Sequence, residues 1–413
     1  MYNIYFCIII SVVVLNFVWE QILSYLNRKQ MSIEVPEQLK GIYNKPEVYT
    51  KQQLYQKENS HFGLVSESFL FIIISVVLSR GTFGWLDTML RKHISNTVLL
   101  PLIFFGIVML TNMIINFPFS WYATFIIEKK FGFNRTTPKL FILDWLKSIL
   151  LNVLIGGLIL SITICIYQYT NKYFWLLAWG VVSIFVLLMN LFYSELIVPL
   201  FNKQTPLETS DLRNAIEIFT KKVGFEISNI YVIDGSKRSS KGNAYFTGMG
   251  KKKRIVLFDT LINELNKEEI LSVLAHEIGH YKKKHIAYSI IGSIISTGIT
   301  FYILSLFLDN LLLAKALGGN THSFHLGLIG FSFLFTPISE LTNLIFLSLS
   351  RKNEYEADAY AANFGLGETL ISGLKKLSVH SLSNLNPHSW VVFWHYSHPT
   401  LLQRIKNLTR SRN

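Results

Sequence analysis

Seven long apolar runs constrain this chain more than any other feature of its sequence. A helix needs about 20 apolar residues to cross a bilayer, and the runs approach or reach that length. They lie near 3–23, 64–80, 98–118, 148–168, 174–194, 286–308 and 325–349. Only 16% of the 413 residues are charged, against about a quarter in soluble domains. We therefore predict an α-helical polytopic membrane protein with seven transmembrane helices.

The first run needs a separate argument, because a secretory signal peptide also begins with an apolar segment. Residues 3–23 lack the basic leading region and the small-residue exit of a signal peptide. Aromatic residues flank the run, as they do at membrane interfaces. We interpret it as a span.

The basic residues predict the orientation of the spans. Lys and Arg gather between spans one and two and between spans three and four, whereas the alternate loops carry few. Because cytoplasmic loops carry the excess of basic residues, the N-terminus is expected outside and the segments after spans five and seven inside. The same loops account for the net charge of +13, so no nucleic acid is expected as a partner. Cys7 and Cys165 both fall in spans and form no disulfide framework.

The spans divide the chain into four predicted parts. Residues 1–194 hold spans one to five, and 195–285 form a cytoplasmic catalytic insert. Residues 286–349 hold spans six and seven, and 350–413 form a cytoplasmic C-terminal segment. The pattern of the insert is typical of a small α/β domain.

Four elements are predicted before the last helix of the insert. An amphipathic helix spans 210–224, with Ser210 as its N-cap. Strands are expected at 229–235, 243–249 and 253–259, with the sequence GKKK forming the turn between the last two.

The last helix of the insert, 267 to about 284, begins with Asn266 and Glu269 in the pattern of a capping box. It contains 276-HEIGH-280. Residues four apart share a helix face, so His276 and His280 can bind one zinc ion, with Glu277 as general base for a water. The alternative is a polar helix face with two solvated histidines.

A catalytic zinc needs a third protein ligand and an open fourth position. The segment 350-SRKNEYEADAYA-361 continues the helix of the seventh span and offers Glu354 as that ligand. Asp358, four residues on, can accept a hydrogen bond from the second ring nitrogen of a ligand histidine. The alternative for Glu354 is a solvated side chain beside Arg351 and Lys352.

These motifs resemble those of the type I CAAX prenyl protease family of integral-membrane zinc metalloproteases. HEIGH, a pair of spans and NEYEADAYA follow in the family's order, and 236–261 and 395-HYSHPTLLQRI-405 resemble two further family segments. The similarity covers nearly the whole chain. It implies seven helices enclosing an intramembrane chamber, closed at its cytoplasmic end by a small zincin-like domain.

The resemblance also implies roles for two residues outside the zinc motif. Asn243 would sit on an edge strand that aligns the substrate backbone, and His398 would stabilise the tetrahedral intermediate. Asn243 could instead cap a turn after Gly242, and His398 could instead cap the terminal helix 400–410.

The expected function is zinc-dependent hydrolysis of a peptide bond near the C-terminus of CAAX-type prenylated peptides, or of similar membrane-delivered peptides. We expect one Zn²⁺ per chain as the cofactor and a monomeric state. The expected partners are the lipid bilayer and a peptide or protein substrate that can be farnesylated. The loop around 309–324 is short, as in bacterial members of the family, and a bacterial source would favour other membrane-associated or misfolded peptides over prenylated substrates. The protein is expected in the inner membrane if bacterial and in the endoplasmic reticulum membrane if eukaryotic, with the catalytic site facing the cytoplasm. The alternatives are a heat-shock-type quality-control protease without prenyl specificity and a metal-stabilised transporter or channel.

Overall fold

The computed structural model describes residues 1–31, 34–43, 45–225, 229–247 and 254–410. Within these residues seven helical segments are long and apolar enough to span a membrane, which confirms the seven predicted spans. They are Ile4–Lys29, Pro46–Ser79, Leu99–Glu128, Pro138–Thr170, Phe174–Phe201, His285–Phe307 and Phe324–Asn363.

Four of the spans are single helices, and each of the other three consists of two or three consecutive helical elements. The helices are α1 (Ile4–Lys29), α2 (Pro46–Ser79), α4 (Leu99–Tyr122) continued by the π-helical turn η2 (Ala123–Glu128), α5 (Pro138–Leu151) joined through the π-helical turn η3 (Asn152–Gly156) to α6 (Gly157–Thr170), α7 (Phe174–Leu196) followed by α8 (Val198–Phe201), α12 (His285–Phe307) and α14 (Phe324–Asn363). The short elements between spans are η1 (Glu37–Leu39), α3 (Thr82–Arg91), η4 (Asn171–Tyr173) and α13 (Leu311–Ala316).

Six spans are longer than the apolar runs that predict them, and the extensions of α2 and α14 are the largest. Helix α2 begins at Pro46, where the fixed φ of proline suits a first helical position, so residues 61–63 lie inside the helix. Helix α14 continues past the predicted end of the seventh span to Asn363. This extension carries Glu354 and Asp358 beyond the apolar run on the same rigid element.

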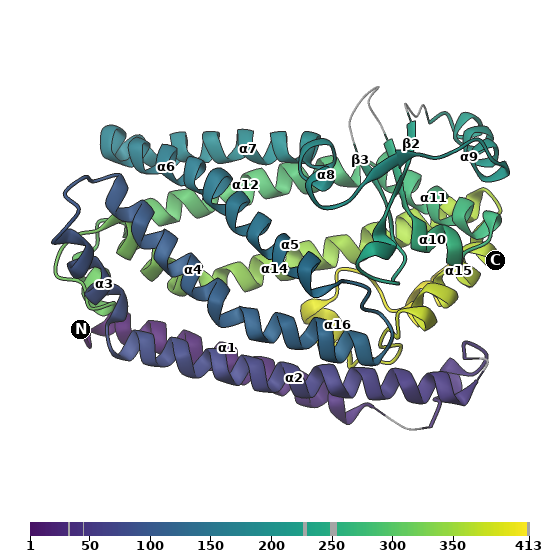
Figure 1. The fold of residues 1–413 in the computed structure, drawn as a ribbon, viewed down its shortest axis with the longest axis horizontal. Coiled ribbons are helices and arrows are strands. Elements are labelled where there is room, and N and C mark those ends of the chain that lie inside the picture. Colours follow the sequence, from purple (N-terminus) through teal and green to yellow (C-terminus); the bar gives the residue numbers. More distant parts are fainter. Residues whose placement is uncertain (32–33, 44, 226–228, 248–253, 411–413) are drawn as a thin grey trace.

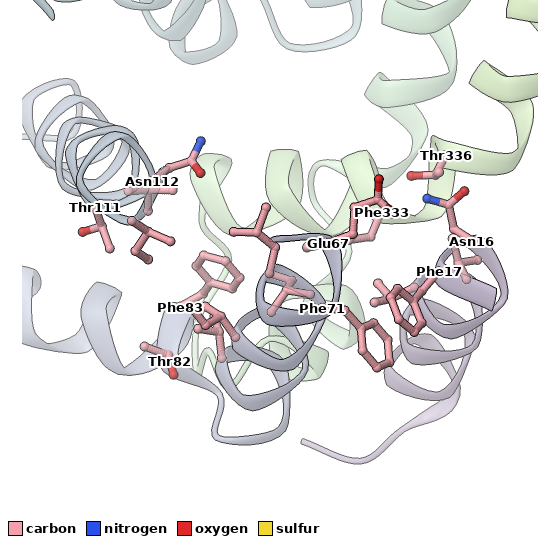
Figure 2. A pocket seen from close by; sticks show the side chains of 18 of the residues that line it. Asn16, Phe17, Glu67, Phe71, Thr82, Phe83, Thr111, Asn112, Phe333 and Thr336 are labelled. Carbon is pink, nitrogen blue, oxygen red and sulfur yellow. The ribbon is translucent and has the colours of Figure 1, made fainter. Parts of the chain in front are cut away.

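The spans form a ring. Helix α1 packs against α2 and α14, α12 packs against α14 and α7, and α6 packs against α7 and α4. Helix α3 contacts both α2 and α4 and so joins the ends of the series. A cavity of about 770 Å³ lies between α1, α2, α3, α4 and α14 (Figure 2). Most of the residues that line it are apolar and include Phe17, Phe71 and Phe83. Asn16 and Glu67 add polar side chains to the lining.

One end of the ring carries a four-stranded sheet. Its strands are β1 (Gln204–Pro206), β2 (Asn229–Ile233), β3 (Ala244–Thr247) and β4 (Arg254–Phe258). Their order is β1-β2-β4-β3, with β2 and β4 parallel and the other two pairs antiparallel. The three predicted strands are thereby confirmed over the described residues, whereas the GKKK turn at 250–253 lies outside them.

Helices surround the sheet and connect it to the spans. They are α9 (Asp211–Lys222), α10 (Asp259–Glu264), α11 (Lys267–Lys282), α15 (Gly367–His380), α16 (Ser389–His395) and α17 (Leu401–Arg410), with the 3₁₀ turn η5 (Gly235–Lys237). The predicted N-cap of α9 is confirmed, because Ser210 accepts a hydrogen bond from the amide of Arg213. The capping box of α11 also forms, between Asn266 and Glu269.

The sheet end of the molecule also gathers the basic loops. Asn27, at the end of α1, accepts a hydrogen bond from the amide of His388, and Lys241 pairs with Glu128 of the third span at 3.0 Å. The loops after spans one and three therefore lie beside the C-terminal segment and the insert. The N-terminus lies at the opposite end of the long axis (Figure 1).

Candidate active site

Two helices bring three potential metal ligands together. On α11 the Nε2 atoms of His276 and His280 lie 3.2 Å apart. From α14, Glu354 places Oε2 at 3.5 Å from His276 Nε2 and Oε1 at 3.2 Å from His280 Nε2. A tetrahedral zinc with bonds of about 2.0–2.1 Å separates its ligand atoms by about 3.3–3.4 Å. The observed separations therefore match a zinc site.

The state of the Glu354 carboxylate supports a cation at this point. Glu354 is buried, and its Oε2 makes no hydrogen bond within the part of the chain that the structure describes. A buried acceptor that makes no hydrogen bond is costly. The Arg404 guanidinium, 3.3 Å from this oxygen, offsets part of that cost, and a cation between the three side chains would offset more. His276, His280 and Glu354 offer ligand atoms that all lie within 4.8 Å of one another.

The close approach of α11 and α14 depends on a glycine inside the HExxH sequence. A Cβ atom on Gly279 would lie 3.0 Å from the Cα of Ala357 and 3.0 Å from the Cβ of Tyr360. Carbon atoms in ordinary contact lie about 3.5–4.0 Å apart. A side chain at this position would push the two helices apart and so separate the histidines from Glu354.

A buried ion pair supports His276 from behind. Asp358 Oδ1 lies 2.9 Å from His276 Nδ1, and Arg404 of α17 donates from Nε and Nη2 to the two carboxylate oxygens at 2.9 and 2.6 Å. Arg404 Nη1 also lies 3.3 Å from Glu354 Oε2. Burial alone would lower the pKa of His276, but the carboxylates of Asp358 and Glu354 more than offset it and raise the pKa to about 9. An environment that favours a proton on the imidazole also favours a metal cation.

Glu277, the predicted general base, lines a cavity together with His280. The cavity has a volume of about 380 Å³, and its lining includes Glu277, His280, Asn190, Ser289 and Ser293. Burial raises the pKa of the Glu277 carboxyl, although the two ligand histidines and Arg404 lower it in part. A carboxylate with a raised pKa is a stronger base, as the activation of a water requires.

The two residues implied by family resemblance have different surroundings. His398 Nε2 lies 3.3 Å from Glu354 Oε1, so this side chain joins the ligand group although it is largely exposed. The alternative role of His398 as a helix cap is wrong, because Thr400 caps α17 through reciprocal hydrogen bonds with Gln403. Asn243 is exposed and directly precedes β3 at the sheet edge, and its Oδ1 accepts from the amide of Ala244. Its role in substrate binding stays a prediction.

Three residues near the ligands were not among the predicted site residues. Arg404 pairs with Asp358, and Gly279 packs against α14. In each case the partner lies in a distant segment, so the sequence shows only that both residues belong to predicted helices. His285 is buried, with Nδ1 at 3.0 Å from Nδ1 of His280. Its spacing of five from His280 gave no reason to place the two rings together.

An HExxH helix, a glutamate from a second helix and a ring of seven spans define a membrane-embedded metalloprotease. Two family models cover almost all of the sequence. Residues 24–203 match the model described as CAAX prenyl protease N-terminal, five membrane helices, and residues 206–412 match Peptidase family M48. The chain belongs to the CAAX prenyl protease family, an M48 family of zinc metalloendopeptidases.

Named relatives align with this chain over nearly their whole length. The CAAX prenyl protease 1 homolog of Oryza sativa subsp. japonica is 34% identical over 409 residues, which cover 97% of this chain and 96% of the relative. CAAX prenyl protease 1 of Saccharomyces cerevisiae is 34% identical over 421 residues, with 95% and 92% covered. A crystal structure of S. mikatae Ste24p superimposes with a TM-score of 0.94 at 33% identity, covering 99% of this chain and 100% of that one. The predicted fold and enzyme class are thereby confirmed.

Proposed function

We propose that this protein cleaves a peptide bond near the C-terminus of CAAX-type prenylated peptides, using one zinc ion per chain. The observation that carries the proposal is the convergence of His276, His280 and Glu354, with Glu277 next to His276 in the sequence. The chain matches relatives named CAAX prenyl protease over nearly their full length. All three ligands come from one chain, which supports a monomer as the active unit.

The residues of the site have separate tasks in this reaction. His276, His280 and Glu354 would hold the zinc, which supplies a Lewis acid for the substrate carbonyl and lowers the pKa of a water. Glu277 takes a proton from the attacking water as its oxygen adds to the carbonyl carbon. As the carbon–nitrogen bond breaks, Glu277 returns that proton to the leaving amine.

Two further side chains bind the substrate in this proposal. His398 stands beside the ligand group at 3.3 Å from Glu354 and is placed to donate a hydrogen bond to the developing oxyanion. β3 is an edge strand, so an extended peptide can add to it as a further strand. Asn243, at the start of that strand, is exposed for contact with the peptide backbone.

The mainly apolar cavity inside the ring supports a prenylated substrate over a plain peptide. It lies among the membrane spans (Figure 2), where a substrate with a lipid chain would arrive. The short loop around 309–324 does not argue against prenylated substrates, because the rice relative aligns with this chain over 96% of its own length. A compact chain is therefore not a mark of bacterial members alone.

The alternative functions are less well supported. The seven spans and the match to CAAX prenyl proteases favour that activity over a heat-shock-type protease. A transporter with a structural metal would have no use for a general base, and Glu277 lines a cavity next to His280.

We also propose that the sheet end of the molecule faces the cytoplasm. The basic loops after spans one and three lie at this end, and cytoplasmic loops carry the excess of Lys and Arg. The relatives from rice and yeast support the eukaryotic alternative, in which the protein resides in the endoplasmic reticulum membrane.

A pair of peptides tests the substrate class. Purified protein is offered a farnesylated CAAX peptide and its unprenylated twin, and kcat/KM is measured for each. Preferential cleavage of the farnesylated peptide supports the proposal. Equal cleavage of both would refute prenyl specificity and favour membrane quality control, whereas failure to cleave either would contradict the protease assignment.

A further inference from the structure

The second ligand histidine has a partner of its own. His285, the first residue of α12, is buried, and its Nδ1 lies 3.0 Å from the Nδ1 of His280. The Nε2 of His285 lies 3.2 Å from Oε2 of Glu356, which α14 carries two residues after Glu354. The three side chains form a continuous series that leads away from the ligand group.

A break between helices makes this contact possible. In a continuous helix, residues five apart point in different directions, because each residue turns the helix by about 100°. Lys284 ends this regularity with a left-handed backbone, φ 59° and ψ 27°. The chain turns there between α11 and α12, and His285 folds back onto His280.

The ligand role of His280 fixes the protons along the series. Nε2 of His280 faces His276 and Glu354, so it must keep a free electron pair to bind a metal. Its proton is then on Nδ1 and is donated to the Nδ1 of His285. That leaves the second proton of this pair on His285 Nε2, which donates it to the Glu356 carboxylate.

The arrangement parallels the support of His276. There, the second ring nitrogen faces the fully buried carboxylate of Asp358 directly. For His280, an imidazole is inserted between the ligand ring and the carboxylate, and Glu356 is 39% exposed. Partners of this kind fix the orientation and the tautomer of a metal ligand.

We propose that His285 and Glu356 are positioning residues that orient His280 and hold its proton on Nδ1, without binding the metal themselves. The inference rests on the proposed zinc site. It predicts a contribution to zinc affinity as well as to the rate of cleavage.

The test compares two replacements of His285. Leucine removes both hydrogen bonds, whereas the amide of glutamine can accept from His280 and donate to Glu356. Zinc affinity is measured by competition with a chelator, alongside kcat/KM. Outer partners of metal ligands contribute about 10–100-fold to metal affinity, so His285→Leu should weaken zinc binding by about that factor, and His285→Gln should retain most of it.

A buried histidine far from the site provides the matched control. His325 pairs with Asp87 at 2.7 Å and is fully buried, and it precedes Glu354 by 29 positions on α14, a distance of about 40 Å. His325→Leu should leave zinc affinity unchanged while it removes a comparable buried pair. Glu356→Gln, at a partly exposed position, should weaken zinc binding less than His285→Leu but more than the control.

The outcomes separate this inference from the zinc site itself. A wild-type protein that binds no zinc would overturn both. Tight zinc binding by the wild type and equally tight binding by His285→Leu would overturn the positioning role alone. If His285→Leu does not fold, zinc affinity in Glu356→Gln equal to that of the control gives the same refutation.

Discussion

Replacement of Arg404 with methionine should destabilise the protein through the charge that it leaves behind. The guanidinium donates two hydrogen bonds, at 2.9 and 2.6 Å, to Asp358, and the Asp358 side chain is fully buried. Methionine replaces much of the aliphatic volume, so the loss is mainly electrostatic. Removal of one partner from a buried ion pair costs about 3–5 kcal/mol.

This cost can be converted to a melting temperature. For a chain of 413 residues, an unfolding entropy of about 2.1 cal/mol/K per residue gives about 0.9 kcal/mol/K. The expected fall in Tm is therefore about 3–6 °C, measured by thermal unfolding of the zinc-loaded protein in detergent. Arg410→Met, at an exposed position on the same helix, is the matched control and should change the Tm little.

A second substitution tests the physical reason. Asp358→Asn in the Arg404→Met background removes the uncompensated charge while its amide oxygen still accepts from Nδ1 of His276. The double variant should regain part of the lost stability. A fall of less than about 1 °C for Arg404→Met, or a double variant less stable than the single one, would show that this pair is not the support we describe.

Three further predictions concern the same end of the molecule. Gly279→Ala places a Cβ 3.0 Å from atoms of α14, so we expect overpacking to destabilise the protein by about 1–3 kcal/mol and to weaken zinc binding, measured by competition with a chelator. Gly157→Ala, with nothing within 4 Å of its Cβ, is the control. Equal zinc affinity in the two variants would contradict the argument. Burial raises the pKa of Glu264 from 4.5 to about 7, so between these values the folded protein keeps a proton that the unfolded chain has released, and stability falls as pH rises through this window. Glu264→Gln should therefore raise the Tm above pH 7 and not below pH 4.5, and a Tm gain that is the same on both sides would refute this assignment. Removal of zinc with a chelator should abolish cleavage and lower the Tm, and zinc at about 100 times its Kd should restore about 2.7 kcal/mol of unfolding free energy. Glu354→Gln should show much less of this zinc-dependent gain in stability. A full gain would exclude Glu354 as a ligand.

The elements that sequence predicts well are those set by local patterns. The spans follow from the length of apolar runs, and α11 follows from its capping box and helical periodicity. His276 and His280 lie together because residues four apart share a helix face. Asp358 follows Glu354 by the same spacing, so that one helix presents both carboxylates to α11.

The other parts of the site depend on the tertiary structure. Arg404 contacts Asp358, from which it is separated by 46 positions along the chain. The sequence around Arg404 indicates only a basic residue in an amphipathic helix. His285 meets His280 because Lys284 adopts a left-handed conformation, which an L-residue such as lysine seldom takes. The need for Gly279 becomes visible only when α11 and α14 are packed together.

The most direct test of the account measures zinc content and peptide cleavage in wild type and Glu277→Gln. Glutamine keeps the size of the side chain but cannot take a proton from water, and Glu277 is not among the three ligands. We predict one zinc per chain in both proteins, with cleavage of the farnesylated CAAX peptide by wild type alone. Cleavage by Glu277→Gln at the wild-type rate, or the absence of zinc from the wild-type protein, would contradict the account.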